Sequence, residues 1–318
     1  MTKTALKLAT FSAVALGLAT QGFAEIPLTD SFSVQGHIAG SYTSMDMDPG
    51  PWSDRYDVDD ALILFTYTGA PITGVASLYY VPNSDTEIDL LDGYVTYDVG
   101  GGLSITGGKY LSYLGYESFF TVNNSTITFA NNDFIGAIPG YQSGLKINYS
   151  DDSVGFGASF VDSLYGNDGE LKENGGAEAH VVLTGIPGFT LFGGLGYQDA
   201  PAGGSSSLVY NIWGSYEVSE KINVGAEFTG LDVNASSGDG YNWLGIVNVA
   251  LTDKVSTAFR ISGEKVDGGG PEFIRYTIAP GIALTEMLGV RAEYTYTDYK
   301  NFSAEKAHFF GVQAFLKF

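Results

Sequence analysis

The chain has 318 residues, with 15 lysines and arginines against 36 aspartates and glutamates, for a formal net charge of −21 at pH 7. An acidic chain lacks the basic footprint that a phosphate backbone requires, so the composition excludes a nucleic-acid partner. Cysteine is absent, which excludes disulfides and thiolate chemistry. The 21 tyrosines and 20 phenylalanines also argue against disorder, because disordered chains are poor in aromatic residues.

Residues 1–24 have the layout of a cleaved secretory signal peptide. Lys3 and Lys7 precede an apolar run, and the small residues Gly22 and Ala24 fit the cleavage rule. The alternative, an anchoring helix, is disfavoured because the apolar run over residues 9–19 is too short to span a bilayer. The sequence therefore predicts export from a bacterial cytoplasm and a single domain over residues 25–318.

From there to the end, apolar and polar residues alternate with period two, which is typical of half-buried β-strands. In LGVRAEYTYTD, from Leu288, apolar and aromatic residues share one face, and charged and hydroxyl residues share the other. About sixteen such segments occur, each near the ten residues expected of a tilted membrane strand. They are predicted to begin near Phe32, Tyr56, Thr73, Glu87, Leu103, Tyr141, Val154, Ala177, Phe189, Leu208, Ile222, Tyr241, Val255, Phe273, Leu288 and His308.

The connections alternate between short turns, such as GAPI, SDDS and LTDK, and long polar loops, such as SMDMDPGPWSDR and DVNASSGDG. A soluble β-sandwich or adhesin also shows alternation and regular turns. However, aromatic residues gather toward the strand ends, as in the interface girdles of membrane barrels, and only a closed barrel leaves no unpaired backbone edge in lipid. The pattern predicts an all-β fold, a transmembrane antiparallel β-barrel in the bacterial outer membrane.

The first long loop is rich in carboxylates, including Asp46, Asp48 and Asp54. Clustered carboxylates suit Ca²⁺, which would bridge lipid phosphates at the cell surface. A solvated acidic loop is the favoured interpretation, so no metal or other cofactor is predicted.

The longest connection, residues 111–140, is unusual because it carries many apolar residues, among them Phe119, Phe120, Ile127 and Phe134. A barrel of sixteen strands encloses an aqueous channel. We expect the connection to fold into this lumen, since an exposed apolar loop promotes aggregation. The alternative is an outward loop that covers the rim or contacts another subunit. If the connection folds into the lumen, five of its polar residues would line the constriction: Glu117, Asn123, Asn124, Asn132 and Asp133.

The segment TGGKYLSYLGYESFFTVNN, from Thr106, continues to IPGYQSGLKINY, which ends at Tyr149. It resembles the OmpL-like β-barrel porins, in which a GK…GYE stretch is followed by an Asn/Ser-rich stretch and a GxQxGL strand start. The matching positions are Gly108, Lys109, Gly115, Tyr116, Glu117 and Gly144. The resemblance implies a diffusion channel but no particular solute. In its layout, the third long loop also occupies the place of the constriction loop in sixteen-stranded porins.

Assigning each strand's aromatic face to lipid predicts which charges point inward. The inward basic residues are Lys146, Arg260, Arg275, Arg291 and Lys317, and the three arginines are expected to form a patch on one wall. Glu117 and Asp133 would face that patch and create a transverse field, since walls of charge are how pores choose ions. The alternative is local pairing, for example of Arg260 with Glu264. Eight inward carboxylates predict a preference for cations: Asp60, Asp92, Asp98, Glu178, Glu217, Glu227, Glu264 and Glu293.

The chain ends on Phe318, which is similar to the aromatic C-terminal signal read by the barrel assembly machinery. The other expected partners are outer-membrane lipid, lipopolysaccharide and small hydrophilic solutes. A homotrimer is implied by the resemblance to porins, among which trimers are common.

The sequence thus predicts a porin for passive diffusion. Catalysis is not expected, because His37, His180 and His308 are accompanied by no serine motif. Two alternatives remain open: a plugged barrel with a structural or surface-binding role, and a sugar-specific channel that uses aromatic residues such as Tyr80 and Trp213.

Overall fold

A computed structural model describes residues 25–80, 88–166, 175–200, 204–234 and 238–318. The predicted signal peptide, residues 1–24, lies outside the described residues. None of the helices in this part of the chain is long and apolar enough to cross a membrane.

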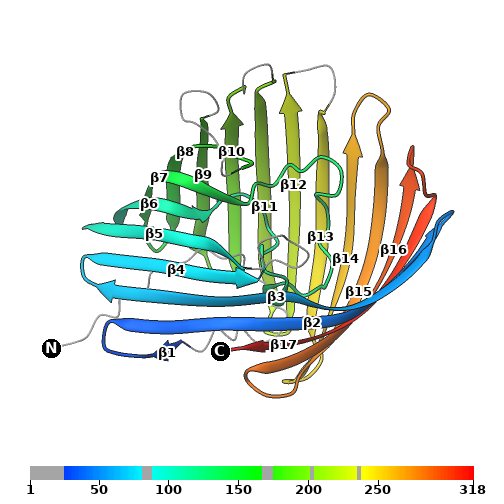
Figure 1. The fold of residues 1–318 in the computed structure, drawn as a ribbon, viewed down its shortest axis with the longest axis horizontal. Helices are drawn as coiled ribbons and strands as arrows, with labels where there is room; N and C mark the ends of the chain where they lie inside the picture. Colours follow the sequence, from blue (N-terminus) through cyan, green and yellow to red (C-terminus); the bar gives the residue numbers. More distant parts are fainter. Residues whose placement is uncertain (1–24, 81–87, 167–174, 201–203, 235–237) are drawn as a thin grey trace.

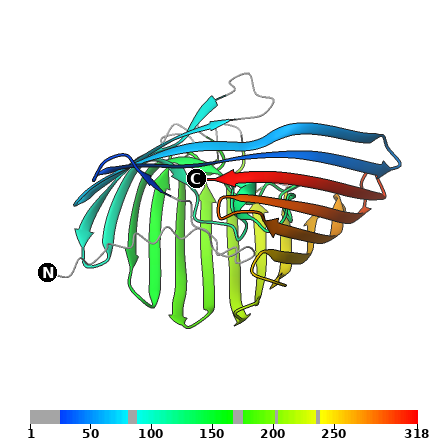
Figure 2. The same ribbon diagram turned by 90° about the horizontal axis from the view of Figure 1, so that it is seen from below.

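Sixteen antiparallel strands form one closed sheet, as the sequence predicts (Figures 1 and 2). A two-residue strand, β1 (Ile26–Pro27), precedes them. The barrel strands are β2 (Phe32–Asp48), β3 (Trp52–Gly69), β4 (Ile72–Tyr80), β5 (Ile88–Gly100), β6 (Leu103–Leu111), β7 (Tyr141–Ser150), β8 (Val154–Val161), β9 (Gly176–Ile186), β10 (Phe189–Gln198), β11 (Ser207–Ser219), β12 (Ile222–Val233), β13 (Gly240–Ala250), β14 (Val255–Val266), β15 (Glu272–Ala283), β16 (Leu288–Lys300) and β17 (Lys306–Lys317).

The barrel closes where the last strand pairs with the first long one. β17 runs antiparallel to β2, with Leu316 opposite Ile38. The Phe318 N–H donates to the Gly36 carbonyl at 2.9 Å, so the last residue extends this pairing. β1 then pairs with the remaining end of β2. Closure satisfies the backbone of both edges, which is the condition for a sheet in lipid.

The strands bury alternate side chains, as their period-two pattern predicts. Along β11, Tyr210 and Ile212 are 43% and 51% exposed on the outer face, whereas Val209 and Asn211 on the inner face are almost completely buried. The same alternation places an apolar band on the outer surface and polar residues inside, which is the arrangement of an outer-membrane barrel.

The short turns fall where the sequence places them, and every predicted strand start but one lies within two residues of the observed start. The exception is β3, predicted from Tyr56 and observed from Trp52. The first loop was predicted to be long, which is wrong: only residues 49–51 separate β2 from β3. The pairing of β2 with β3 continues up to this turn, where Asp46 lies opposite Trp52.

Residues 112–140 join β6 to β7 and are called the long connection below. They contain a single turn of 3₁₀ helix, η1 (Thr121–Asn123). In Figure 1 this segment leaves β6, runs across to the side of the barrel formed by β12 to β14, and returns to β7.

Candidate functional site

Carboxylates on the inner face of the barrel accept hydrogen bonds from the backbone of the long connection. Glu178 on β9 accepts from the Tyr113 N–H at 3.2 Å, and Glu227 on β12 accepts from the Tyr116 N–H at 2.7 Å. Asp60 on β3 accepts from the Thr121 N–H at 3.1 Å. These strands lie on different sides of the barrel, so the connection is attached at several points around the wall.

Two further carboxylates hold the second half of the connection. Glu264 on β14 accepts four backbone N–H groups from residues 132–135 at 2.5–3.1 Å. Glu293 on β16 accepts from the N–H groups of Ile127 and Thr128 and from the Thr128 hydroxyl. Both carboxylates are 1% exposed. A buried carboxylate requires such compensation, and so does buried backbone without secondary structure.

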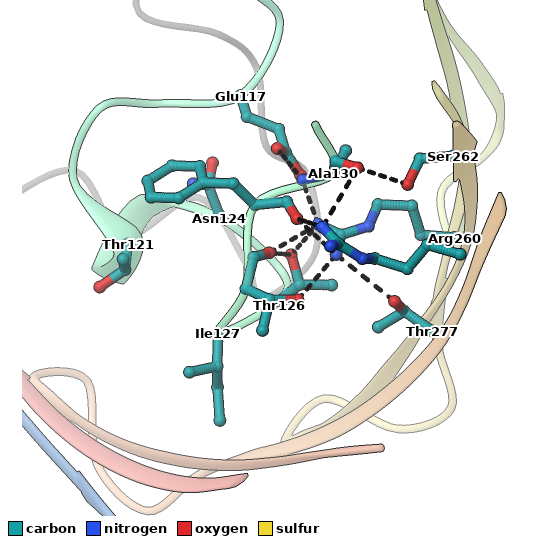
Figure 3. Close-up of polar contacts among 12 residues, drawn as sticks. Glu117, Thr121, Asn124, Thr126, Ile127, Ala130, Arg260, Ser262 and Thr277 are labelled. Atoms are coloured by element: carbon teal, nitrogen blue, oxygen red, sulfur yellow. Dashed lines mark hydrogen bonds and ion pairs between the residues drawn. The ribbon is translucent and has the colours of Figure 1, made fainter. Parts of the chain in front are cut away.

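Arg260 on β14 binds the connection from the same wall (Figure 3). Its guanidinium lies 2.6 Å from the Glu117 carboxylate and donates to the Thr126 hydroxyl at 2.8 Å and to the Thr128 carbonyl at 2.7 Å. Two residues further along the same strand, the Ser262 hydroxyl donates to the Ala130 carbonyl at 2.6 Å. The arginine therefore both pairs a carboxylate of the connection and satisfies its carbonyls.

The other two arginines act in the same way. Arg275 on β15 pairs with Asp133 at 2.5 Å and donates to the Phe129 carbonyl at 2.9 Å. Arg291 on β16 donates to the carbonyls of Asn124 and Thr121, the latter at 2.8 Å. Together, inner-face carboxylates hold the N–H groups of the connection and inner-face arginines hold its carbonyls.

The structure corrects the predicted transverse field. The three arginines do share one wall, but Glu117 and Asp133 contact them directly instead of facing them across a gap. The predicted local alternative, pairing of Arg260 with Glu264, is also wrong, because the Glu264 carboxylate accepts hydrogen bonds from the backbone of residues 132–135. The reason is desolvation: a buried charge is stable only when it is paired and hydrogen-bonded, so opposite charges in a dry contact come together.

The asparagines predicted for the constriction have different positions. Asn124 bonds within the connection, accepting from the Ser118 N–H at 2.8 Å. Asn132, at φ 79°, accepts from the Ile138 N–H at 3.0 Å. Asn123 instead accepts from the Lys317 ammonium at 3.2 Å. Two of the three asparagines therefore stabilise turns of the connection itself.

Apolar side chains of the connection pack on the inner wall. Leu114 and Tyr116 join a buried cluster with Phe192 and Trp213, and the rings of Tyr116 and Trp213 are 5.6 Å apart. Burial raises the pKa of the Tyr116 phenol, and the neighbouring carboxylates of Glu117 and Glu227 raise it further, so this residue stays neutral. This packing removes the apolar side chains of the connection from water.

A cavity of ≈ 1480 Å³ lies beside the connection, lined from the short turns up to the level of Asp92 and Tyr141. Of the predicted constriction residues, Glu117 and Asn123 line it; of the predicted inward basic residues, Lys146 and Lys317 line it and the three arginines do not. The arginines contact the connection, whereas the open space is bounded by β3 to β7 on one side and by the short turns between β11 and β16 on the other. Most charged groups that line the cavity therefore differ from those that hold the connection, and Glu117 and Lys317 belong to both sets.

Aromatic rings on the inner face line part of this cavity; Trp213 is predicted from the sequence for a sugar-specific channel, whereas sequence reasoning missed Phe192. His180, Phe192 and Trp213 come from the adjacent strands β9, β10 and β11, and the last two rings stack at 5.2 Å with an interplanar angle of 8°. Assigning every aromatic face to lipid hides such residues. The signal that finds them is phase: Trp213 alternates with the outward residues Ile212 and Tyr216.

The acidic residues proposed for a surface Ca²⁺ are not brought together as a site. Asp48 pairs with Lys306 at 3.0 Å, and Asp54 accepts from the Tyr42 hydroxyl at 3.3 Å. Within the described ranges, no group of three or more histidine or acidic side chains is arranged to hold a metal ion.

The closed sixteen-stranded barrel with an apolar outer band defines an integral protein of the bacterial outer membrane. Its residues 72–318 match the family described as "Putative beta-barrel porin-2, OmpL-like", and the chain belongs to this family. No curated protein matches the sequence.

Solved structures show the same fold at low sequence identity. OprB of Pseudomonas putida aligns with a TM-score of 0.71 at 12% identity, over 91% of this chain and 94% of that one. An anion-selective porin from Comamonas acidovorans gives 0.69 at 10% identity, over 91% and 99%. A trimer form of OmpT, an outer membrane protein of Vibrio cholerae, gives 0.64 at 15% identity, over 91% and 100%.

Proposed function

We propose that the protein is a porin, a water-filled channel for the passive diffusion of small hydrophilic solutes, in which the long connection narrows the passage. The observation that carries this proposal is the cavity of ≈ 1480 Å³ beside a connection that is held by buried charges on several strands. A mobile plug has no need of such anchoring. Membership in a porin family supports the same function.

The test is single-channel recording with purified protein in a planar bilayer. Discrete, stable current steps in KCl are expected, and shortening the connection by removing residues 124–133 is expected to enlarge them. A silent barrel whose current appears only after this deletion would favour the alternative of a plugged structural or surface-binding protein. That alternative draws on the same dense hydrogen bonding of the connection.

The channel is proposed to prefer cations. The carboxylates that hold the connection do not enter this argument, since backbone donors occupy them. Leaving out Glu117, which is paired with Arg260, five carboxylates line the cavity against four lysines: Asp92, Asp98, Glu217, Glu220 and Asp253 against Lys146, Lys221, Lys254 and Lys317. Charges that line a passage set its ion preference. A reversal potential of the sign expected for anions across a salt gradient would contradict the proposal.

No catalytic role is proposed. His37 lies in the wall with Asp60 at 2.7 Å, His180 stacks among aromatic rings, and His308 accompanies Tyr294 on the outer face. These surroundings do not provide the pair of nucleophile and base that hydrolysis requires.

The proposed assembly is a homotrimer in outer-membrane lipid and lipopolysaccharide, inserted by the barrel assembly machinery through the C-terminal residue Phe318. The trimer form of the OmpT structure supports the oligomer. Chemical cross-linking in native membranes tests it, since a monomer band alone would contradict the trimer.

A further inference from the structure

Lys146 on β7 is a cation in the cavity wall without an anionic partner. Its ammonium lies over the rings of Tyr110, Tyr113 and Tyr94, at 4.2, 5.3 and 5.9 Å from their centroids. In the described ranges, no carboxylate oxygen lies within 4.0 Å of it and it donates no hydrogen bond. An ammonium has three donors, so ring faces alone leave its hydrogen bonds to water or to a solute.

The carboxylates nearest in effect to Lys146 are already engaged. Asp92 accepts from the hydroxyls of Ser77 at 2.8 Å and Tyr141 at 3.2 Å. Glu178 accepts from the Ser112 hydroxyl at 2.5 Å and from a side-chain amide of the wall. Among the described residues neither carboxylate lies within 4.0 Å of the ammonium, although both lower the potential around it.

The ring nearest to this cation is that of Tyr110, with its centroid 4.2 Å from the ammonium. The Tyr110 side chain lines the cavity, is 2% exposed, and its hydroxyl has no hydrogen-bond partner among the described residues. Buried polar groups are normally paired, so each exception needs an explanation. A bound anionic group next to Lys146 would supply an acceptor to both.

A row of rings continues from this point along the wall. Tyr113 contacts the His180 ring with centroids 4.1 Å apart, His180 stacks on Phe192 at 5.7 Å, and Phe192 stacks on Trp213 at 5.2 Å. All four line the same cavity. The flat ring of a solute stacks on such a surface. A cation at one end of the row favours a solute whose ring carries a negatively charged group.

We propose that Lys146 and the adjoining aromatic row form a binding subsite for an organic anion that carries a flat ring, the chemical class of the aromatic carboxylates. The carboxylate binds at Lys146 and Tyr110, and the ring lies against Tyr113 and His180. The subsite rests on the proposed channel function, because it lies in the passage. It makes the passage slow a particular class of solute within an otherwise general pore.

The experiment is current block by benzoate in single channels recorded in KCl. Benzoate is expected to produce concentration-dependent block, with acetate and benzyl alcohol, which each carry one half of the recognised chemistry, each at least about tenfold weaker. Lys146→Gln is expected to weaken the benzoate block about tenfold or more, and Lys146→Arg to retain most of it. Lys254→Gln is the matched control, because it removes the same charge from the cavity mouth, away from the tyrosines.

The outcomes separate the subsite from the channel. Absence of current steps in KCl without any solute would overturn the channel itself. Normal steps with equal block by benzoate, acetate and benzyl alcohol, or equal loss in Lys146→Gln and Lys254→Gln, would overturn the subsite alone. Block by neutral sugars that survives Lys146→Gln would also overturn it and would favour the sugar-specific alternative. Normal KCl conductance of each variant shows that it has folded.

Discussion

Arg260 and Glu117 form an ion pair of 2.6 Å across 143 residues of sequence, and the arginine side chain is fully buried. One partner is on a wall strand and the other is on the long connection, so the pair attaches the connection to the wall. It is one of several such contacts around the barrel.

Replacing Arg260 by Met is expected to release the middle of the connection. Glu117 loses its cationic partner and the Thr128 carbonyl loses its donor, and breaking one side of a buried pair costs about 3–5 kcal/mol. The measurement is urea unfolding in detergent together with single-channel recording, in which larger and noisier current steps are expected. Stability and current noise equal to those of the wild type would contradict the role of Arg260 in holding the connection.

Glu264→Gln is expected to detach the end of the connection. The carboxylate accepts four backbone N–H groups, whereas an amide replaces one acceptor oxygen by a donor that faces them. Hydrogen bonds to charged groups contribute about 1.5–3 kcal/mol each, so we expect a loss of at least that size in urea unfolding.

Glu272→Gln is the control for this change. Glu272 pairs at 3.4 Å with Lys300, whose side chain is 62% exposed, and such a surface pair contributes about 0–1 kcal/mol. A similar loss of stability in both variants would show that removing a charge destabilises the barrel in general, and that the backbone hydrogen bonds to Glu264 are not the cause.

Ion preference is expected to follow the cavity-lining carboxylates. The double variant Asp98→Asn/Glu217→Gln removes two of the five and is expected to shift the reversal potential toward anions. Glu272→Gln/Glu305→Gln removes the same charge outside this lining and is expected to shift it far less. Equal shifts would mean that the overall charge of the protein, and not the passage, sets the preference.

Gly108 of the GK…GYE motif is expected to tolerate no side chain. Its φ is +133°, and a Cβ would lie 2.2 Å from the Gly93 carbonyl oxygen and 2.6 Å from the Tyr94 Cα. Gly107 next to it has only a methyl group at 3.8 Å. Gly108→Ala is therefore expected to cost about 1–3 kcal/mol in urea unfolding and Gly107→Ala far less. Equal losses would contradict the strain at Gly108.

The sequence by itself determined the barrel. Period-two alternation is a local consequence of the pleat, and short turns at regular spacing set the number of strands, so sixteen strands could be counted without a structure. The same phase correctly placed Arg291 and Glu293 on the inner face of β16. The first loop was misjudged because turn-forming residues such as Pro49 and Gly50 do not reveal how far the flanking strands extend past the membrane.

Only the tertiary structure decided what the inward charges do. Alternation assigns Arg260 and Arg275 to the inner face, but it contains nothing about the path of a 29-residue connection that has no regular period. That path is chosen by desolvation, which joins each buried charge to whichever backbone group or opposite charge can reach it across the closed barrel. Lys146 was left facing the cavity for the same reason: no carboxylate of the connection reaches it.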